Sequence, residues 1–336
     1  MNATNRGGAY RERTERVEQE VLSSRAQLAA ASKGRAVPEP DDEMRTCFQR
    51  DRDRIVHSKA FRRLAHKTQV FLAPEGDHYR VRLTHTLEVT QVARNIARAL
   101  RLNEDLVEAV CLGHDLGHTP FGHLGEEVVA SWTPGFRHNL QSVRIVEVLE
   151  RLNLTQEVRD GIANHTWSMP MPDTLEAQIA RFADRIAYLN HDIDDAIRAG
   201  VLSEMDLPEA TRKGLGSGHS SRISTMVGDL VTTSESGGDI AMTPDIAEAM
   251  TVTRDFLFER VYLGRISSAT TEAVRHIVRT LLDHYASNPV PEDEGRWAEN
   301  HRQAAVDYVA GMTDRFALRA YGRVAGEPIP EFGVLG

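Results

Sequence analysis

The chain is organised around one stretch, Leu112-Gly-His-Asp-Leu-Gly-His-Thr-Pro-Phe-Gly-His-Leu-Gly-Glu126. This stretch collects side chains that bind metals or carry protons, namely His114, Asp115, His118, His123 and Glu126. Adjacent helical positions face different ways, so a His-Asp pair reaches one metal only where a helix ends or bends. Glycine is the residue that commonly ends or bends helices, and Gly113 and Gly117 flank the pair. The stretch therefore predicts a metal-centred hydrolytic site at a helix end.

Apolar residues recur at helical spacing on both sides of this stretch, and no sustained strand alternation appears. A helix over residues 104–115 would turn His114 inward with its apolar side, and a preceding helix, capped by Thr84, would begin with His85. We therefore expect an all-α fold with at most a small β-hairpin around Lys67–Leu72 and the Pro74/Gly76 turn. Further helices are expected at residues 11–31, 126–131, 141–152, 156–164, 177–199, 222–232, 246–262, 265–286 and 296–323.

Composition along the chain predicts four parts. Residues 1–40 are a polar N-terminal segment and linker that closes with Pro38-Glu-Pro40. Residues 41–200 form the catalytic core, and residues 201–245 form a connection rich in Gly, Ser and Thr. Residues 246–336 are expected to form a helical C-terminal region that packs on the core.

The overall composition is that of a globular protein: of 336 residues, 41% are hydrophobic and 26% charged. No apolar run approaches the ~20 residues of a membrane span, and the polar start of the chain does not resemble a signal peptide. The two cysteines, Cys47 and Cys111, lack metal-ligand spacing. We expect a cytoplasmic protein without membrane partners.

The net charge of −9 argues against general nucleic-acid binding, but the segment 45–67 is a basic block. Such a block is a candidate for handling phosphate. Taken alone, it more simply indicates a solvated helix face with internal ion pairs, to which Asp51 and Asp53 would contribute.

Two residues outside the central stretch are the best further metal ligands. Asp184 lies among apolar residues, on the same helix side as Ala180 and Ala187. A carboxylate aimed at a core needs a cation, and a metal is one, although pairing with a neighbouring arginine is the simpler alternative. His85 alone is more often a hydrogen-bonded core histidine than a ligand. Convergence of His85, His114, Asp115 and Asp184 would favour a divalent metal.

With these residues in place, the chain resembles the deoxyguanosine triphosphate triphosphohydrolase branch of the HD superfamily, the deoxynucleoside triphosphate (dNTP) triphosphohydrolases. The matching stretches are Asp53-Arg-Ile-Val-His-Ser-Lys-Ala-Phe-Arg-Arg-Leu-Ala-His-Lys-Thr-Gln-Val-Phe71, Arg82-Leu-Thr-His-Thr-Leu-Glu-Val89, residues 114–126, His138-Asn-Leu-Gln-Ser-Val-Arg144 and Phe182-Ala-Asp-Arg-Ile-Ala-Tyr-Leu-Asn-His-Asp192. A weaker match is Arg254-Asp-Phe-Leu-Phe-Glu-Arg-Val-Tyr262. The resemblance implies an HD-type helical core.

The resemblance also implies a reaction, the hydrolysis of a dNTP to deoxynucleoside and inorganic triphosphate with attack on the α-phosphorus. The metal would be Mg, Mn, Co, Fe or Ni, because a His2Asp2 set suits each of them. His123 with Glu126 matches one catalytic pair of the family, and His118 with His138 matches another. Both versions stay open at this point.

The remaining implied site residues bind substrate. Arg82 and Arg185 match phosphate-contacting positions, and the arginine fork suits phosphate oxygens. His165 would join them or be a buried polar residue beside Trp167. Gln69 and Asp192 match positions that bind the 3′ hydroxyl, and Tyr188 would exclude a 2′ hydroxyl. Asn139, with Gln141, matches further positions near the substrate.

Two other functions remain compatible with the sequence. One is an HD-type deoxynucleotide phosphatase, and the other is a nucleotide-sensing or nucleic-acid-binding HD protein that uses the basic block for single-stranded nucleic acid. The resemblance further implies a homo-oligomer that responds to a nucleotide effector.

Overall fold

The computed structural model describes residues 8–69, 80–262, 268–291 and 298–327. Within these ranges the regular structure is helical, and β pairing is limited to two isolated bridges, Arg35 with Thr155 and Thr68 with Val81. The expected all-α class is confirmed. The expected hairpin shows only its Thr68–Val81 bridge, because residues 70–79 lie outside the described part of the chain.

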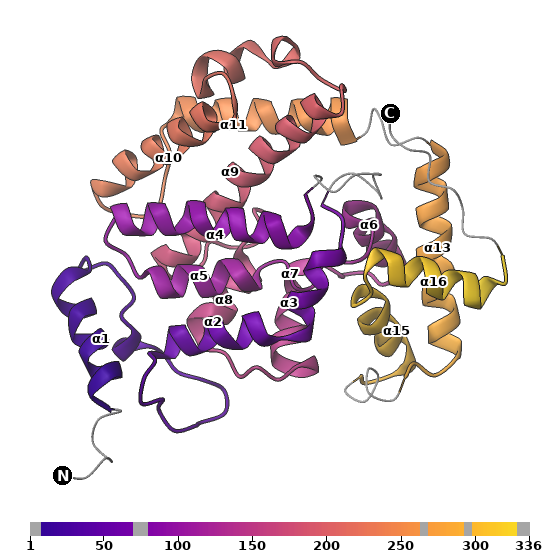
Figure 1. Ribbon diagram of the computed structural model, residues 1–336, viewed down its shortest axis with the longest axis horizontal. Helices are drawn as coiled ribbons and strands as arrows, with labels where there is room; N and C mark the ends of the chain where they lie inside the picture. The colour runs from indigo at the N-terminus through magenta and orange to yellow at the C-terminus, as the bar shows by residue number, and fades with distance from the viewer. Residues whose placement is uncertain (1–7, 70–79, 263–267, 292–297, 328–336) are drawn as a thin grey trace.

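The centre of the molecule is a layer of helices packed on the long helix α9 (Leu175–Arg198) (Figure 1). α4 (Arg82–Ala99) and α5 (Glu104–Gly113) pack against it and against each other. α2 (Cys47–His57) covers α5, and α8 (Gln156–Asn164) closes the layer beside α9. The apolar faces of these helices form the larger hydrophobic core, in which Ile96, Val110 and Ile186 are fully buried.

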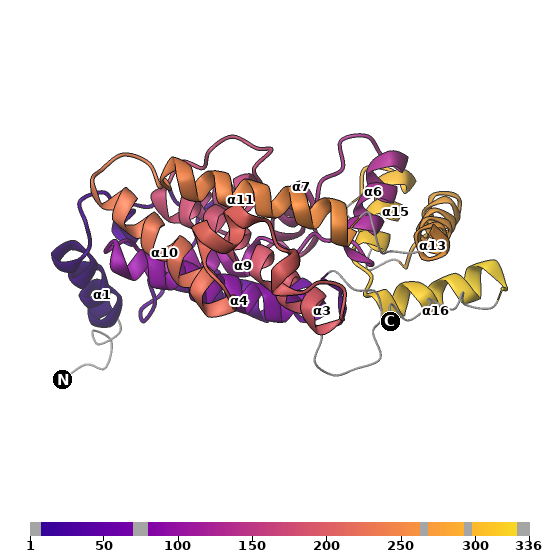
Figure 2. The same ribbon diagram turned by 90° about the horizontal axis from the view of Figure 1, so that it is seen from above.

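The remaining elements surround this layer, with α1 at one end and α13 and α16 at the other (Figures 1 and 2). They are α1 (Gly8–Val21), α3 (Lys59–Arg63), α6 (Gly122–Trp132), α7 (His138–Arg144) with a π-helical turn at Ile145–Leu149, α10 (His219–Glu235), α11 (Pro244–Leu257) with a π-helical turn at Phe258–Tyr262, α13 (Ser268–Ser287), α15 (His301–Ala310) and α16 (Asp314–Ala325).

A second hydrophobic core lies at the C-terminal end of the molecule. It combines Val128 and Val129 of α6 with apolar residues of α13, α15 and α16, including Leu281, Val309 and Tyr321. The C-terminal helices therefore pack on the segment that follows the central histidine stretch. Helices α10 and α11 pack instead on the larger core, through Met226 and Met250. The four-part division of the chain stays a prediction.

Several expected helices end at different residues. The helix expected over 11–31 ends at Val21, because the chain folds back and the Ala29 amide donates to Glu18. The helix expected over 296–323 is broken between α15 and α16, where Gly311 ends one helix and Thr313 caps the next. α4 begins at Arg82, two residues before Thr84, which was expected to be its N-cap. Thr84 lies within the first turn instead, and its hydroxyl accepts a hydrogen bond from the Val81 amide. None of the described helices is long and apolar enough to cross a membrane.

Candidate active site

The central histidine stretch leaves α5 at Gly113 and runs across α7. The Gly117 amide donates to Ser142 Oγ at 2.8 Å, and the same hydroxyl donates to the His114 carbonyl at 2.8 Å. A β-carbon at Gly117 would collide with the backbone of α7, so only glycine allows this approach. The stretch then turns at Phe121, in the left-handed region with φ 64°, before α6 begins. The result is a loop that carries His118 past the end of α5 and leads into His123 in the first turn of α6.

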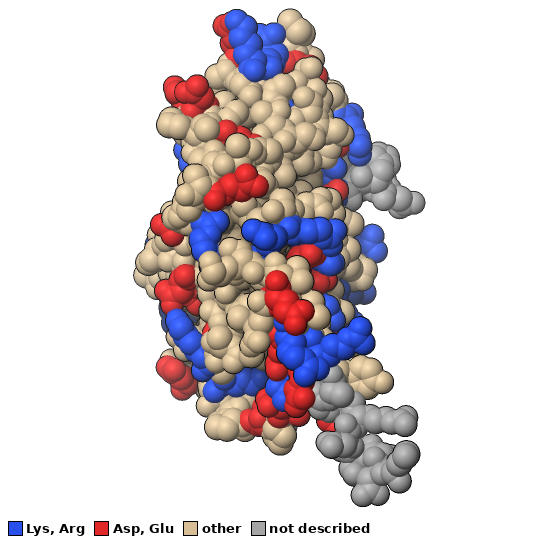
Figure 3. All heavy atoms as spheres, turned by 90° about the vertical axis from the view of Figure 1, so that its left-hand side faces the viewer, with Lys and Arg blue, Asp and Glu red and all other residues tan. Residues whose placement is uncertain are grey.

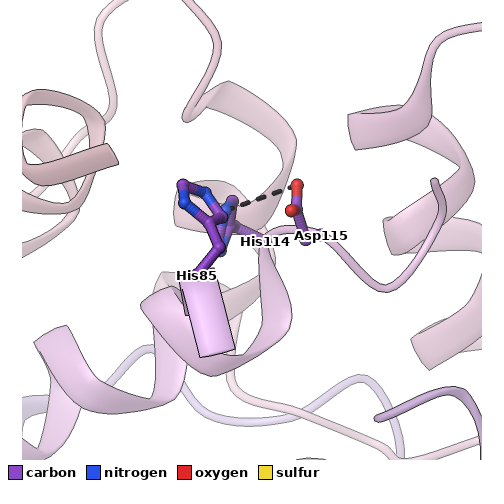
Figure 4. A group of neighbouring side chains, drawn as sticks. All are labelled: His85, His114 and Asp115. Atoms are coloured by element: carbon purple, nitrogen blue, oxygen red, sulfur yellow. Dashed lines mark ion pairs between the residues drawn. The ribbon is translucent and has the colours of Figure 1, made fainter. Parts of the chain in front are cut away.

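Four of the predicted residues converge at this helix end. His85 Nε2 lies 3.1 Å from Asp184 Oδ1, while His114 Nε2 lies 3.3 Å from Asp115 Oδ1 and 3.7 Å from Asp184 Oδ1. Figure 4 shows His85 rising from α4 toward the ring of His114, with Asp115 facing that ring. Candidate ligand atoms of His85, His114 and Asp115 all lie within 4.8 Å of one another. The group could hold a divalent metal.

The hydrogen bonding of His114 favours a cation at this position. Its Nδ1 donates to the Cys111 carbonyl at 2.6 Å, so in the neutral ring the lone pair lies on Nε2. Among the described residues Nε2 is buried without a hydrogen-bond partner, and it faces oxygens of Asp115 and Asp184. A lone pair among carboxylate oxygens is repelled unless a cation lies between them. The donor set therefore fits a metal on both geometry and chemistry.

A second cluster lies next to this group and contains Glu126, His138 and His165. Glu126 accepts His138 Nδ1 at 2.9 Å and the His138 backbone amide at 2.8 Å. His138 Nε2 lies 3.2 Å from His165 Nε2, and His165 Nδ1 donates to the Ile162 carbonyl at 2.9 Å. Because the carbonyl fixes His165 Nε2 as an acceptor, His138 must donate from both nitrogens. The network therefore favours a protonated His138.

The pKa values of the neighbouring groups agree with this protonation pattern. Burial alone lowers the pKa of His138, but the Glu126 carboxylate outweighs it, and the net shift is upward. Burial lowers the pKa of His165 to about 3 and, with the charge of Arg82, lowers that of His118 well below its ordinary value. Asp115 keeps a strongly lowered pKa despite its burial, because the ring N–H of His118 and the charge of Arg82 stabilise its carboxylate. One protonated histidine thus lies among neutral ones.

Arg82 is buried beside the metal group. Its Nη1 donates to Asp115 Oδ2 at 2.9 Å, whereas its buried Nε and Nη2 find no hydrogen-bond acceptor among the residues that the structure describes. A guanidinium with unused buried donors is unusual, since buried polar groups nearly always find a partner. An anion bound in the site would accept hydrogen bonds from these two donors.

Most of these groups border one cavity of about 710 Å³. The predicted residues that line it are Gln69, Arg82, His85, Asp115, His118, His123, His138, His165, Asp184, Arg185, Tyr188 and Asp192. His114, Glu126 and Asn139 lie behind the wall: His114 faces the metal group, and Glu126 supports His138. Asn139 is buried and donates to the Ala163 carbonyl.

The same cavity is also lined by residues that sequence reasoning had not assigned. They are Phe121, Leu124, Glu127, Thr166, Trp167, Arg254, Asp255 and Phe258. Trp167 lies under the guanidinium of Arg185, whose Cζ is 3.6 Å from the ring centre. Arg254 and Asp255 form an ion pair of 2.6 Å and fall within the weakly matching stretch at 254–262. Arg254 and Asp255 could not be assigned to the site from the sequence, because they lie far along the chain from the histidines.

Tyr188 and Asp192 follow Asp184 at successive turns of α9 and line the same cavity. Burial raises the pKa of Tyr188 to about 12, so its hydroxyl stays neutral. Burial, reinforced by the nearby Asp195, also raises the pKa of Asp192 well above its ordinary value. One face of α9 thus carries the ionised carboxylate of Asp184, followed by Tyr188 and Asp192, whose pKa shifts favour their neutral forms.

The basic block at 45–67 does not form an open cationic surface. Arg45 and Arg52 pair with Asp53, and Arg50 and Arg54 pair with Glu39. Figure 3 shows acidic and basic side chains interleaved on the face of the molecule at the α1 end. Ion pairing within the block is confirmed for Asp53 with Arg45 and Arg52. The expected contribution of Asp51 is wrong, because Asp51 is buried and pairs with Arg35 outside the block. Binding of single-stranded nucleic acid or an effector nucleotide, and self-association, stay predictions.

Comparison with known proteins gives consistent family matches. Residues 82–189 match the model of the HD domain, and residues 240–323 match that of a phosphohydrolase-associated domain. Proteins of Caldanaerobacter subterraneus subsp. tengcongensis, Desulfatibacillum aliphaticivorans and Bordetella pertussis are 53%, 47% and 39% identical to this chain. The alignments cover 94%, 94% and 90% of this chain and 95%, 97% and 96% of the relatives. Each is named a deoxyguanosinetriphosphate triphosphohydrolase-like protein.

A solved structure shares the fold. It is that of a hypothetical protein from Aquifex aeolicus, with a TM-score of 0.51 and 19% sequence identity. The match covers 80% of this chain and 67% of that chain.

Proposed function

This chain belongs to the deoxyguanosinetriphosphate triphosphohydrolase-like family of HD-domain proteins, and we propose that it hydrolyses deoxynucleoside triphosphates to deoxynucleoside and inorganic triphosphate. One observation carries the proposal. A single cavity brings together a His2Asp2 metal group, a protonated histidine and a buried arginine with unused donors. These are the parts that cleavage of a phosphate ester requires: a Lewis acid, a proton donor and a fixed cation for phosphate oxygens.

The metal would be held by His85, His114, Asp115 and Asp184. His85 and His114 are neutral nitrogen donors, and the two carboxylates supply negative charge, a set that suits several divalent ions. When bound, such an ion lowers the pKa of a water molecule and draws electron density from a phosphate oxygen. The buried lone pair of His114 Nε2 supports this assignment.

His138 acts as the proton donor in this proposal. Water attacks the α-phosphorus and releases one proton to the solvent, the bond from phosphorus to the 5′ oxygen breaks, and that oxygen takes the proton from His138 Nε2. A proton from the solvent then restores His138. Glu126 holds the opposite nitrogen at 2.9 Å and stabilises the charged ring before transfer. In the structure His138 Nε2 contacts His165, and the substrate's 5′ oxygen replaces His165 as its hydrogen-bond partner. The family resemblance left two catalytic pairs open, His123 with Glu126 and His118 with His138. The Glu126–His138 contact supports a pair that takes one residue from each, in which Glu126 orients His138 and stabilises its charge.

Arg82 binds the triphosphate through the donors that Asp115 leaves free. Because Arg82 also pairs with Asp115, it joins the anion to the metal group at a fixed distance. Arg185 lies farther along the same wall, held flat by Trp167, and serves the outer phosphates. His123, exposed at the cavity beside His118, is placed to contact the same phosphates.

Tyr188, Gln69 and Asp192 form the sugar pocket. Tyr188 is placed between Arg185 and Asp192 along α9, where an aromatic ring would close the space that a 2′ hydroxyl needs. Gln69 Oε1 is buried and receives no hydrogen bond from the described part of the chain, and a 3′ hydroxyl would supply one.

Product analysis tests the proposal. The metal-loaded protein is incubated with each dNTP and the matching ribonucleotides, and the products are separated. Inorganic triphosphate with free deoxynucleoside is expected. Pyrophosphate with monophosphate, or activity on monophosphates alone, would refute the proposal and point to the phosphatase alternative. Asp184→Asn should abolish hydrolysis. Asp194→Asn, on the same helix but outside the cavity lining, loses only its pairs with Arg80 and Arg198 and should retain hydrolysis.

A further inference from the structure

The loop between His118 and Phe121 is held from outside the catalytic core. The Phe121 amide donates to Asp314 Oδ1 at 3.0 Å, and Asp314 is the first residue of α16. At the other end, the His118 carbonyl accepts a hydrogen bond from Lys67 Nζ. Lys67 Nζ also donates to the carbonyl of Ala310, the last residue of α15, at 2.8 Å. Both ends of the loop are thus tied to the break between α15 and α16.

Asp314 makes a second connection, to the segment that carries Gln69. Its Oδ2 accepts the Thr68 amide at 2.9 Å and also the Thr68 hydroxyl. One carboxylate therefore joins the residue before Gln69 to Phe121, two residues before His123. The two segments touch, since a β-carbon at Gly122 would lie 3.1 Å from the Gln69 carbonyl.

The burial of Lys67 makes its two hydrogen bonds necessary. The residue is 1% exposed, and burial lowers its pKa to about 7, so each hydrogen bond that its amino group donates replaces a lost bond to water. Phe121 in turn adopts a left-handed conformation that non-glycine residues avoid, and its amide is held by Asp314. The loop conformation is therefore maintained by contacts made outside the loop itself.

We propose that Asp314, with Lys67 as its partner on the other end of the loop, is a positioning residue that sets the placement of His118 and His123 over the substrate. Through it, the helical C-terminal region becomes part of the machinery of the site. Three of the four metal-group residues are held elsewhere, because His85, His114 and Asp184 come from α4, the end of α5 and α9. The fourth, Asp115, precedes the loop and lies 3.2 Å from His118 Nε2. The effect on hydrolysis rests on the proposed function, whereas the effect on the two imidazole rings does not.

Asp314→Asn tests the proposal. The amide presents a donor where the carboxylate accepted, so the bond to Thr68 or to Phe121 is lost. We expect kcat to fall by ~10- to 100-fold with little change in KM, since small misplacements cost that much. Metal affinity should be unchanged. In ¹⁵N-histidine spectra of the full chain, the ring signals of His118 and His123 should shift while those of His85 and His114 stay in place.

Asp283→Asn is the matched control. Asp283, on α13, also links the C-terminal helices to α6, by accepting Trp132 Nε1 at 2.7 Å, but it contacts neither end of the loop. It should keep wild-type kcat and spectra. Asp314→Glu, which retains two acceptor oxygens, should recover part of the lost kcat.

Two results would overturn the proposal: wild-type ring signals of His118 and His123 in Asp314→Asn, or equal effects of Asp314→Asn and Asp283→Asn. If Asp314→Asn does not fold, Thr68→Val removes only the hydroxyl bond to Asp314 and should shift the same two signals to a smaller extent. Unshifted signals in that variant would equally reject the positioning role. If the protein does not hydrolyse dNTPs, the spectra still decide this question.

Discussion

The imidazole rings of His118 and His138 lie stacked, with centroids 3.9 Å apart and planes inclined by 15°, yet their pKa values shift in opposite directions. Burial and the charge of Arg82 lower the pKa of His118, while Glu126 raises that of His138. Two protonated rings in this stack would repel each other. The stack is stable because one ring is neutral and the other carries the proton.

Glu126→Gln should remove the charge that keeps His138 protonated beside a neutral His118. Without the carboxylate, the pKa of His138 falls, and the fraction able to donate a proton at neutral pH falls with it. We expect kcat to drop by ~100-fold or more, a typical contribution of a positioned acid. The alkaline limb of the profile of kcat against pH should move to lower pH. An unmoved limb would show that His138 is not the titrating donor.

Metal removal should inactivate the protein and destabilise it. A bound ion stabilises only the folded state, and without it the oxygens of Asp115 and Asp184 face the lone pair of His114. Treatment with a chelator should lower Tm, and Mn²⁺ or Co²⁺ should restore it.

Asp115→Ala should bind less than ~0.1 equivalent of metal after dialysis, because the metal group loses one of its two carboxylates. Elemental analysis beside the wild type measures this value. Full metal content with full activity would remove Asp115 from the site.

Tyr188→Ala should weaken discrimination against ribonucleotides. The ring that closes the space at the sugar is deleted, and a pocket change of this size alters selectivity by about tenfold or more. Tyr188→Phe keeps the ring and is the control. The ratio of kcat/KM for each dNTP to that for its ribonucleotide is the quantity to compare. Equal ratios in all three proteins would place the sugar elsewhere.

Glu176→Gln should change how stability depends on pH. Glu176 is fully buried, and burial raises its pKa to about 7, from 4.5. A raised folded-state pKa contributes stability that is complete below pH 4.5 and is lost as the pH rises through 7. A shift of this size corresponds to at most about 3 kcal/mol. Denaturant unfolding between pH 4.5 and 8 should show a flatter profile for the variant, and parallel profiles would contradict this origin.

Much of the fold could be predicted because it depends on local pattern. The helix expected at 156–164 has those bounds, and α9 was expected within two residues at its start. Periodic apolar residues identify such helices, since each must bury one face. The break at Gly311–Thr313 was missed because the helical pattern continues across it. Its reason lies in the polar contacts of Ala310 and Asp314 with distant segments.

The sequence by itself determined which residue types gather near the end of α5, and spacing on a helix was enough to place Asp184, Tyr188 and Asp192 on one face. The tertiary structure alone decided that Glu126 pairs with His138, that Arg82 keeps two unused donors, and that Asp314 holds Thr68 and Phe121 together. The reason is physical. Spacing encodes neighbours within a turn or two of helix, whereas the tautomer, pKa and orientation of a side chain depend on burial and on groups brought close through space.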